Sequence, residues 1–382
     1  MTPIYLDYNA TTPIAPEVSI AMQPYLEHMF GNPSSSNALG QAAKAAIQQA
    51  REQVAHLLNG DPSEVTFTSG GTESNNHALK GVAAALKHKG RHIITSAVEH
   101  PAVIEVCRHL EKQGYEVTYL TVDKWGTVKV KNVASAIRPD TILISIMHAN
   151  NETGTLQPLA EIAQLAKKHG ILVHTDAAQS IGKVPTNAKQ LGVDLLTIAG
   201  HKLYAPKGIG ALYIKSGTPI ENLLHGAGQE SGRRPGTENV MHIVGLGKAC
   251  DLAASKLAGQ QRHLLELRNL LLEELQKQVK CEMIIHTPLK NSLPNTLSVA
   301  FKGIPAHELA AMVSSKVSIA TGSACHSGTT TISSVLKAMG IDEATGRSTV
   351  RLSVGKYSTK DEVRKAALEI ANGIESLSKG IK

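Results

Sequence analysis

Residues 171–202 read ILVHTDAAQSIGKVPTNAKQLGVDLLTIAGHK, in which two short apolar runs, 171–174 and 195–198, each lead into polar residues. Apolar runs of this length between turn residues favour strands that are buried on both faces. Such strands are typical of a mostly parallel sheet with helices packed on both of its sides. The segment therefore predicts an α/β fold.

The same alternation of apolar runs and helical stretches continues on both sides of this segment. It predicts helices that begin near Glu73, Pro101 and Leu159. The expected strands of this region are 65–68, 92–95, 142–146, 171–174, 195–198 and 211–214.

Beyond residue 250 the pattern changes, which indicates a second and smaller α+β domain. A helical stretch covers 251–280, two alternating runs follow at 297–301 and 349–354, and a helix comes last. We expect a large domain at 15–250 and a small domain formed by 1–14 together with 251–382.

Composition restricts the possible classes of protein. The chain has 382 residues and a net charge of +7, with only 1 Trp, 8 Tyr and 3 Phe, so few aromatic rings are present to stack on bases. No lysine or arginine precedes Lys44, which disfavours a secretory or mitochondrial leader. No run of 18 apolar residues is present. We expect a cytoplasmic protein that binds neither membrane nor nucleic acid.

The four cysteines are widely separated, so neither a disulfide framework nor a metal site is expected. Cys325 differs from the others because its neighbours are small, polar or glycine, which suggests a mobile loop and not a packed core. A thiolate is the reactive form of cysteine, and the adjacent His326 is a candidate for lowering the pKa of Cys325.

Polar residues follow five consecutive predicted strands, at the edge where ligands bind in open α/β sheets. A Gly70-Gly71 turn opens a helix after the first strand, which favours an anion such as phosphate. The strands that follow end in an imidazole, amides, a carboxylate and a lysine, and the residues concerned are His100, Asn150, Asn151, Asp176, Gln179 and Lys202.

These residue types are the ones that a pyridoxal-phosphate enzyme requires. Such enzymes need a lysine that forms a Schiff base, and an aspartate that keeps the pyridine nitrogen protonated so that the ring can accept electrons. Lys202 and Asp176 are the candidates for these two groups.

Eight motifs occur in an order that resembles the cysteine desulfurases, the NifS/IscS-like branch of the class V aminotransferases, with their selenocysteine lyase relatives. The resemblance covers about residues 4–370. The motifs are LDYNATTP (6–13), GNPSS (31–35), SGGTESNN (69–76), NNETG (150–154), HTDAAQ (174–179), GHK (200–202), RPGTEN (234–239) and GSAC (322–325).

The resemblance implies a fold type I architecture with a mostly parallel seven-stranded sheet, and it implies roles for cofactor residues. Lys202 would hold pyridoxal 5'-phosphate, with Asp176 on the pyridine nitrogen and His100 stacked on the ring as an acid–base group. The remaining cofactor residues would be Gly71, Thr72 and His201 at the phosphate, Asn151 and Gln179 near the phenolic oxygen, and Thr237 from the partner of a homodimer.

The implied reaction converts L-cysteine to L-alanine. Arg351 and Asn32 would bind the substrate, and the freed Lys202 would remove its Cα proton. The Cys325 thiolate would then attack the substrate sulfur and keep it as a persulfide, which the loop would pass to a sulfur acceptor, such as a scaffold protein for iron–sulfur cluster assembly.

Three residues depart from the usual desulfurase pattern: Ala199 replaces a serine or threonine, Asn37 replaces a histidine, and His326 follows the cysteine. Ala199 and the Cys-His pair resemble the selenocysteine lyase branch, so release of selenium from L-selenocysteine is the alternative. A non-catalytic PLP-binding scaffold is a more distant one, since it would require a damaged site.

Overall fold

A central sheet organises the larger part of the chain. In the computed structural model, which describes residues 3–326 and 329–380, this sheet has seven strands in the order β2-β8-β7-β6-β5-β3-β4. All run parallel except β8, which is antiparallel to both of its neighbours. The strands are β2 (Val65–Thr68), β3 (His92–Ser96), β4 (Glu116–Leu120), β5 (Thr141–Ser145), β6 (Leu172–Asp176), β7 (Leu195–Ala199) and β8 (Gly210–Ile214).

The predicted mostly parallel, seven-stranded α/β sheet is confirmed. Sequence reasoning placed six of its strands and missed β4, whose residues are largely exposed or half-buried at the edge of the sheet. An edge strand lacks the continuous apolar run on which the prediction relied.

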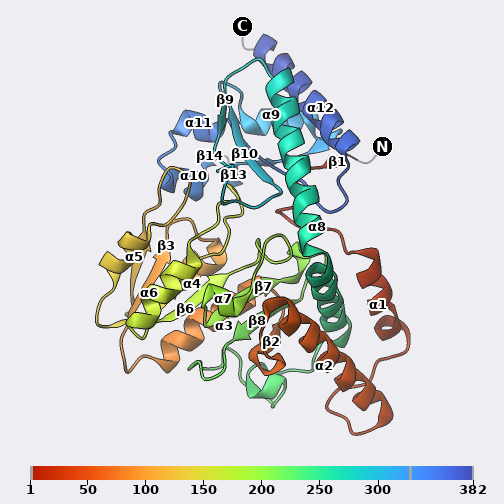
Figure 1. The fold of residues 1–382 in the computed structure, drawn as a ribbon, viewed down its shortest axis with the longest axis vertical. Coiled ribbons are helices and arrows are strands. Elements are labelled where there is room, and N and C mark those ends of the chain that lie inside the picture. The colour runs from red at the N-terminus through yellow and green to blue at the C-terminus, as the bar shows by residue number, and fades with distance from the viewer. Residues whose placement is uncertain (1–2, 327–328, 381–382) are drawn as a thin grey trace.

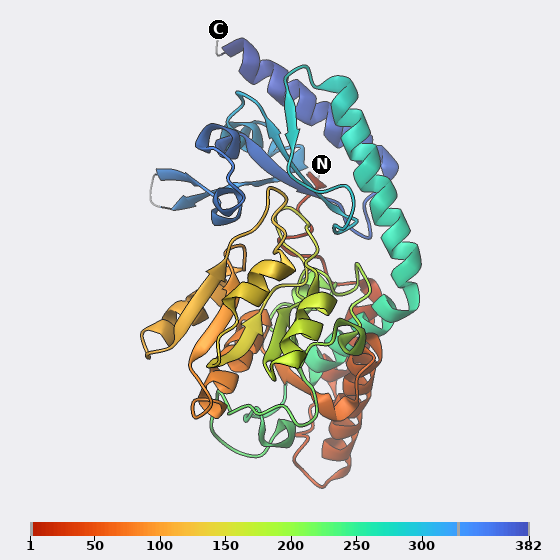
Figure 2. The same cartoon turned by 60° about the vertical axis from the view of Figure 1, so that its left-hand side comes forward.

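Both faces of the sheet are buried under helices (Figures 1 and 2). Successive residues of a strand pack into different hydrophobic clusters, as Ile93 and Ile94 of β3 do. Helices α3 (Gly71–Ala85) and α4 (Pro101–Glu111) contribute to one cluster. The other face packs against α2 (Ala38–Leu58), α6 (Leu159–Lys168) and the start of α8 (Val240–Gln278).

A smaller sheet lies at the other end of the molecule, with strand order β12-β15-β10-β9 and antiparallel pairing among the strands described. Its core includes Leu297 and Phe301 and residues of α8, α9 and α12. The bounds are β9 (Met283–Ile285), β10 (Thr296–Phe301), β12 (Ala320–Thr321), β15 (Thr349–Ser353), α9 (Ala306–Val313) and α12 (Lys360–Gly380).

Two segments join the two sheets. Helix α8 begins at Val240, earlier than the predicted 251, and runs beside both parts of the molecule (Figure 2). The N-terminal strand β1 (Ile4–Tyr5) pairs with β11 (Val317–Ser318), and Leu6 belongs to the core of the smaller sheet. Tyr8 already packs in the core of the larger one. The expected domain division at residue 250 falls inside α8 and stays a prediction.

The segment around Cys325, where the sequence suggested a mobile loop, contains two paired strands that sequence reasoning did not predict. Strands β13 (Ser323–His326) and β14 (Thr329–Ile332) pair antiparallel, with Cys325 opposite Thr330. Three successive β-branched threonines, 329–331, favour an extended backbone and explain the difference. The hairpin extends from the smaller part of the molecule (blue, left, in Figure 2).

The remaining helices are short apart from α1, and they connect the larger elements. None of the helices among the described residues is both long and apolar enough to span a lipid bilayer. They are α1 (Pro16–Glu27), α5 (Val130–Ala136), α7 (Ala188–Leu191), α10 (Ser334–Ala338), α11 (Glu343–Arg347) and the 3₁₀ segments η1 (Pro62–Glu64), η2 (Gly200–Lys202) and η3 (Glu230–Gly232).

Packing of α8 against the smaller sheet yields a stability prediction. Leu267 is fully buried there, whereas Leu265 on the same helix is 40% exposed. Leu267→Ala should lower the free energy of unfolding by about 2–5 kcal/mol, because it leaves a cavity in a close-packed core. Urea denaturation measures the change, with Leu265→Ala as the matched control. Equal effects of the two substitutions would contradict the packing.

Candidate active site

The carboxyl ends of the parallel strands surround a cavity of about 310 Å³. Eight of the nine predicted cofactor residues line it, the exception being Thr237, and Arg351 reaches it from the smaller sheet. The lining comprises Asn9, Ala10, Gly71, Thr72, Asn75, His100, Ala102, Met147, Ala149, Asn151, Asp176, Ala178, Gln179, Ala199, His201, Lys202 and Arg351.

One end of the cavity is suited to an anion because it contains the N-terminus of α3. Gly70 precedes the helix with φ 152° and ψ −178°, a conformation available mainly to glycine. The first N–H groups of the helix lack partners within it and carry the positive end of its dipole. A Cβ at Gly71 would lie 3.2 Å from that of Ala199, so these two small residues pack closely.

His201 lies at the same end and is largely uncharged near neutral pH. Its Nδ1 lies 3.1 Å from the Thr11 hydroxyl. Burial, together with the nearby positive charge of Lys202, lowers the pKa of His201 to about 4.

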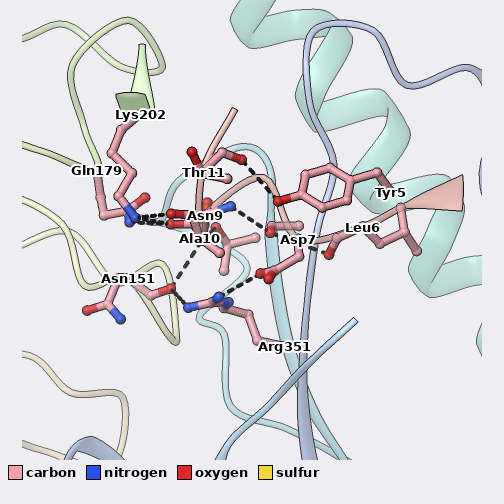
Figure 3. A network of polar contacts seen from close by, with 12 residues as sticks. Tyr5, Leu6, Asp7, Asn9, Ala10, Thr11, Asn151, Gln179, Lys202 and Arg351 are labelled. Atoms are coloured by element: carbon pink, nitrogen blue, oxygen red, sulfur yellow. Dashed lines mark hydrogen bonds and ion pairs between the residues drawn. The ribbon is translucent and has the colours of Figure 1, made fainter. Parts of the chain in front are cut away.

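The Lys202 amine is held by backbone oxygens. Its Nζ donates to the carbonyls of Asn9 and Ala10 at 2.6 and 2.7 Å (Figure 3). Burial lowers the pKa of Lys202 to about 8; the charge of Arg351 acts in the same direction, and Asp176 opposes it. A lysine amine in this state is available as a nucleophile near neutral pH.

The carboxylate of Asp176 is fixed by two donors. Asn75 Nδ2 donates to one oxygen at 2.8 Å, and the Ala178 N–H donates to the other at 2.9 Å. The Asn75 Oδ1 atom is buried and has no hydrogen-bond partner in the described part of the chain. The sequence contained Asn75 inside a motif, but nothing in its spacing predicted a contact with a residue 101 positions away.

His100 is the N-cap of α4, and its Nδ1 accepts the Ala102 N–H at 3.1 Å. In the neutral ring, therefore, the proton is on Nε2. The ring is open to solvent on one side, yet the loss of surrounding water lowers its pKa, with Asp176 opposing the shift and Lys202 adding to it.

Asn9 connects most of these groups and was not assigned a role from the sequence (Figure 3). It is 1% exposed, and its carbonyl accepts from both Lys202 and Gln179. Its side chain donates to the Asn151 carbonyl and to the Thr296 hydroxyl, at 3.1 and 2.8 Å. Asn9 therefore joins the cavity to the smaller sheet.

Arg351 reaches the cavity from β15. One nitrogen pairs with Asp7 at 2.7 Å and another donates to the Asn151 carbonyl at 3.1 Å (Figure 3). Its Nε is buried without a hydrogen-bond partner among residues 3–326 and 329–380. The guanidinium thus has an unused donor beside the cavity.

Two predicted site residues that the structure describes, Asn32 and Thr237, do not line the cavity. Asn32 is exposed and its side chain accepts the Ser34 N–H, while Thr237 is exposed in the loop before α8. The side chain of Cys325 lies outside the described part of the chain, as does that of His326. Asn37 caps the N-terminus of α2 through the Gly40 N–H, so this departure from the family pattern has a local structural role.

Comparison with known proteins identifies the family. The family model described as aminotransferase class-V matches residues 4–365. The chain belongs to the class-V aminotransferases.

Similar proteins agree with this assignment. Cysteine desulfurase IscS of Dictyoglomus turgidum is 46% identical over 361 residues, which are 94% of this chain and 91% of that protein. A solved structure described as a NifS-like protein has a TM-score of 0.93, with 39% identity over 99% of this chain and all of that one. Another, described as SspA in complex with cysteine, has a TM-score of 0.81, with 39% identity over 93% of this chain and 99% of that one.

The resemblance predicted from the motifs is confirmed, and with it the cofactor of this class-V aminotransferase, pyridoxal 5'-phosphate. The cavity fits that molecule. It offers a lysine amine, a fixed carboxylate and an open helix N-terminus, and the unpaired Oδ1 of Asn75 adds a free acceptor. Which residue makes which contact with the cofactor stays a prediction.

The lowered pKa of Lys202 predicts how the apoprotein captures its cofactor. Only the unprotonated amine attacks an aldehyde, so the rate of covalent PLP binding should rise with pH through a midpoint near 8. Stopped-flow absorbance over a pH series measures it, with N-acetyl-lysine, whose amine titrates near 10.4, as the control. A midpoint near 10 for the protein would contradict the effect of burial.

Proposed function

We propose that this chain is a pyridoxal-phosphate-dependent cysteine desulfurase, which converts L-cysteine to L-alanine and forms a persulfide on Cys325. The observation that carries the proposal is a single cavity lined by a lysine, an aspartate, a histidine and an arginine. These four residues come from separate elements of the fold, and the structure brings them together. The names of the relatives support the same activity.

The cofactor, when bound, draws electrons away from the Cα atom of the amino acid. Lys202 would hold it and, once released, its amine would take the Cα proton, a role that suits a base with a pKa of about 8. Asp176, fixed by Asn75 and the Ala178 N–H, would keep a positive charge on the pyridine nitrogen.

Arg351 would bind the substrate carboxylate, which a planar guanidinium can hold through two parallel hydrogen bonds. Asp7 occupies one of its nitrogens, and the free Nε faces no competing acceptor among the described residues. His100, with its proton on Nε2, would serve as the acid–base group beside the cofactor ring.

Sulfur transfer would occur at Cys325. Its thiolate attacks the substrate sulfur, the substrate carbon–sulfur bond breaks, and the persulfide remains on Cys325 while a proton completes L-alanine. The position of Cys325 in a hairpin attached to the smaller sheet would let the persulfide be offered to an acceptor protein.

We also propose that the active form is a homodimer. Thr237 lies outside the cavity of its own chain and exposed on the loop before α8, as expected for a residue that completes the site of a partner. Asn32, likewise exposed, is proposed as a substrate contact only within such a dimer.

Selenocysteine lyase activity is less well supported. The similar proteins from Dictyoglomus turgidum and Methanosarcina thermophila are named cysteine desulfurases. A non-catalytic scaffold is disfavoured because Lys202, Asp176 and His100 are all present in the cavity.

The decisive experiment compares alanine formation from L-cysteine and L-selenocysteine. The wild-type protein should be yellow and should release alanine and sulfide from L-cysteine under reductant. Lys202→Ala should abolish turnover of both substrates. Cys325→Ala should abolish desulfuration but spare part of the selenocysteine reaction, since selenol leaves more readily. Normal desulfuration by Cys325→Ala would refute the persulfide role.

Arg351→Lys tests the carboxylate site. The lysine keeps the positive charge but loses the paired donors, so the KM for L-cysteine should rise roughly 10- to 100-fold, as expected for lost hydrogen bonds to a charged group. The visible absorption of the bound cofactor should not change. Arg347→Lys, at an exposed ion pair with Glu343, is the control. An unchanged KM would remove Arg351 from substrate binding.

A further inference from the structure

Lys183 is a buried lysine that the proposed mechanism does not use. It is 4% exposed, and the described ion pairs do not include it. Its Nζ donates to Gln179 Oε1 at 3.0 Å and to Asn9 Oδ1 at 3.2 Å. Lysines are rarely buried without a carboxylate, so an uncharged pair of partners at this place requires an explanation.

Both partners of Lys183 belong to the cavity. Gln179 and Asn9 line it, and Gln179 Nε2 donates to the Asn9 carbonyl, which also accepts from Lys202. Lys183 therefore lies directly behind residues that line the cavity, and it is linked to the Lys202 amine through the Gln179 amide and the Asn9 carbonyl.

The contact with Lys183 determines the orientation of the Gln179 amide. A lysine ammonium only donates hydrogen bonds, so the amide must turn its oxygen toward Lys183. The NH₂ group is then on the opposite side, where one hydrogen serves the Asn9 carbonyl and the second remains free. Without Lys183, only the hydrogen bond to the Asn9 carbonyl would hold the amide in this orientation.

The charged groups that affect the pKa of Lys183 are both positive. Burial lowers the pKa of Lys183 to about 7, and the charges of Lys202 and Arg351 act in the same direction. No acidic group is among the charges that act on it. The proton on Lys183 is therefore held chiefly by its two amide acceptors, Gln179 and Asn9.

We infer that Lys183 is a positioning residue of the cofactor site, which locks the Gln179 amide so that its NH₂ group faces the cavity as a hydrogen-bond donor. The inference rests on the proposed role of Gln179 beside the phenolic oxygen of the cofactor. Lys183 itself does not touch the cofactor, and it acts through the orientation of Gln179.

The test uses Lys183→Met, Gln179→Ala and the double variant. Methionine is similar in length and apolar, so it suits the buried position. Two quantities are measured on the holoenzyme without substrate: the dissociation constant of PLP, and the midpoint of the pH titration of its visible absorption. Lys189→Met, on the exposed surface of the neighbouring α7, is the matched control.

Lys183→Met should weaken PLP binding about tenfold, as expected for the loss of one buried hydrogen bond. It should also raise the titration midpoint by about one pH unit, because the cofactor keeps its proton to higher pH when a hydrogen-bond donor to its oxygen is lost. Gln179→Ala should act similarly, and the double variant should resemble either single one. Lys189→Met should match the wild type.

Three results would overturn the inference: a wild-type midpoint in Lys183→Met, additive effects in the double variant, or an equal shift in Lys189→Met. Should Lys183→Met fail to fold, Gln179→Glu serves instead. The glutamate side chain still accepts a hydrogen bond from Lys183, but it lacks the NH₂ group that faces the cavity. The midpoint of the cofactor's pH titration must therefore rise, and an unshifted midpoint refutes the inference. Failure of the proposed function is a separate observation, namely wild-type protein that binds PLP but forms no alanine from L-cysteine.

Discussion

The structure depends on the burial of one small polar residue, Asn9, between the two sheets. Its backbone and side chain together bond to Lys202, to Gln179, to Asn151 and to the strand that begins with Thr296. Buried polar groups are costly unless they are paired, so each of these partners is constrained by the others. The N-terminal segment is thereby a structural member of the site, although it lies far from it in sequence.

The parallel order of the strands is the second constraint on where the residues of the cavity lie. Because six of the seven strands point the same way, the residues that follow them gather at one edge, and the chemistry of the site is assembled from loops that need not be long. Asn9 and Ala10 of the N-terminal segment are exceptions, as is Arg351, which comes from the antiparallel sheet. The site therefore lies between the two parts of the molecule, where the ion pair of Arg351 with Asp7 also forms.

Loss of water sets the protonation of this site. Burial is the largest cause of the lowered pKa of Lys202, Lys183 and His201 alike, and the mutual repulsion of positive charges adds to it. The cavity therefore contains an amine and an imidazole that lose their protons at lower pH than usual, beside a fixed carboxylate, and a second such amine lies behind it. Such an arrangement favours proton transfer and attack by an amine over simple ion binding.

The sequence alone determined the class of fold, and eight of the nine residues that it predicted for cofactor binding line one cavity. Apolar strands buried on both faces have a distinctive local pattern, and the residues that end them, such as Asp176 and Lys202, occur at predictable positions. Tertiary structure decided what depends on contacts distant in sequence: the edge strand β4, the early start of α8, and the bonds of Asn75 and Lys183. No local pattern encodes a hydrogen bond between residues a hundred positions apart, because that contact exists only once the chain has packed.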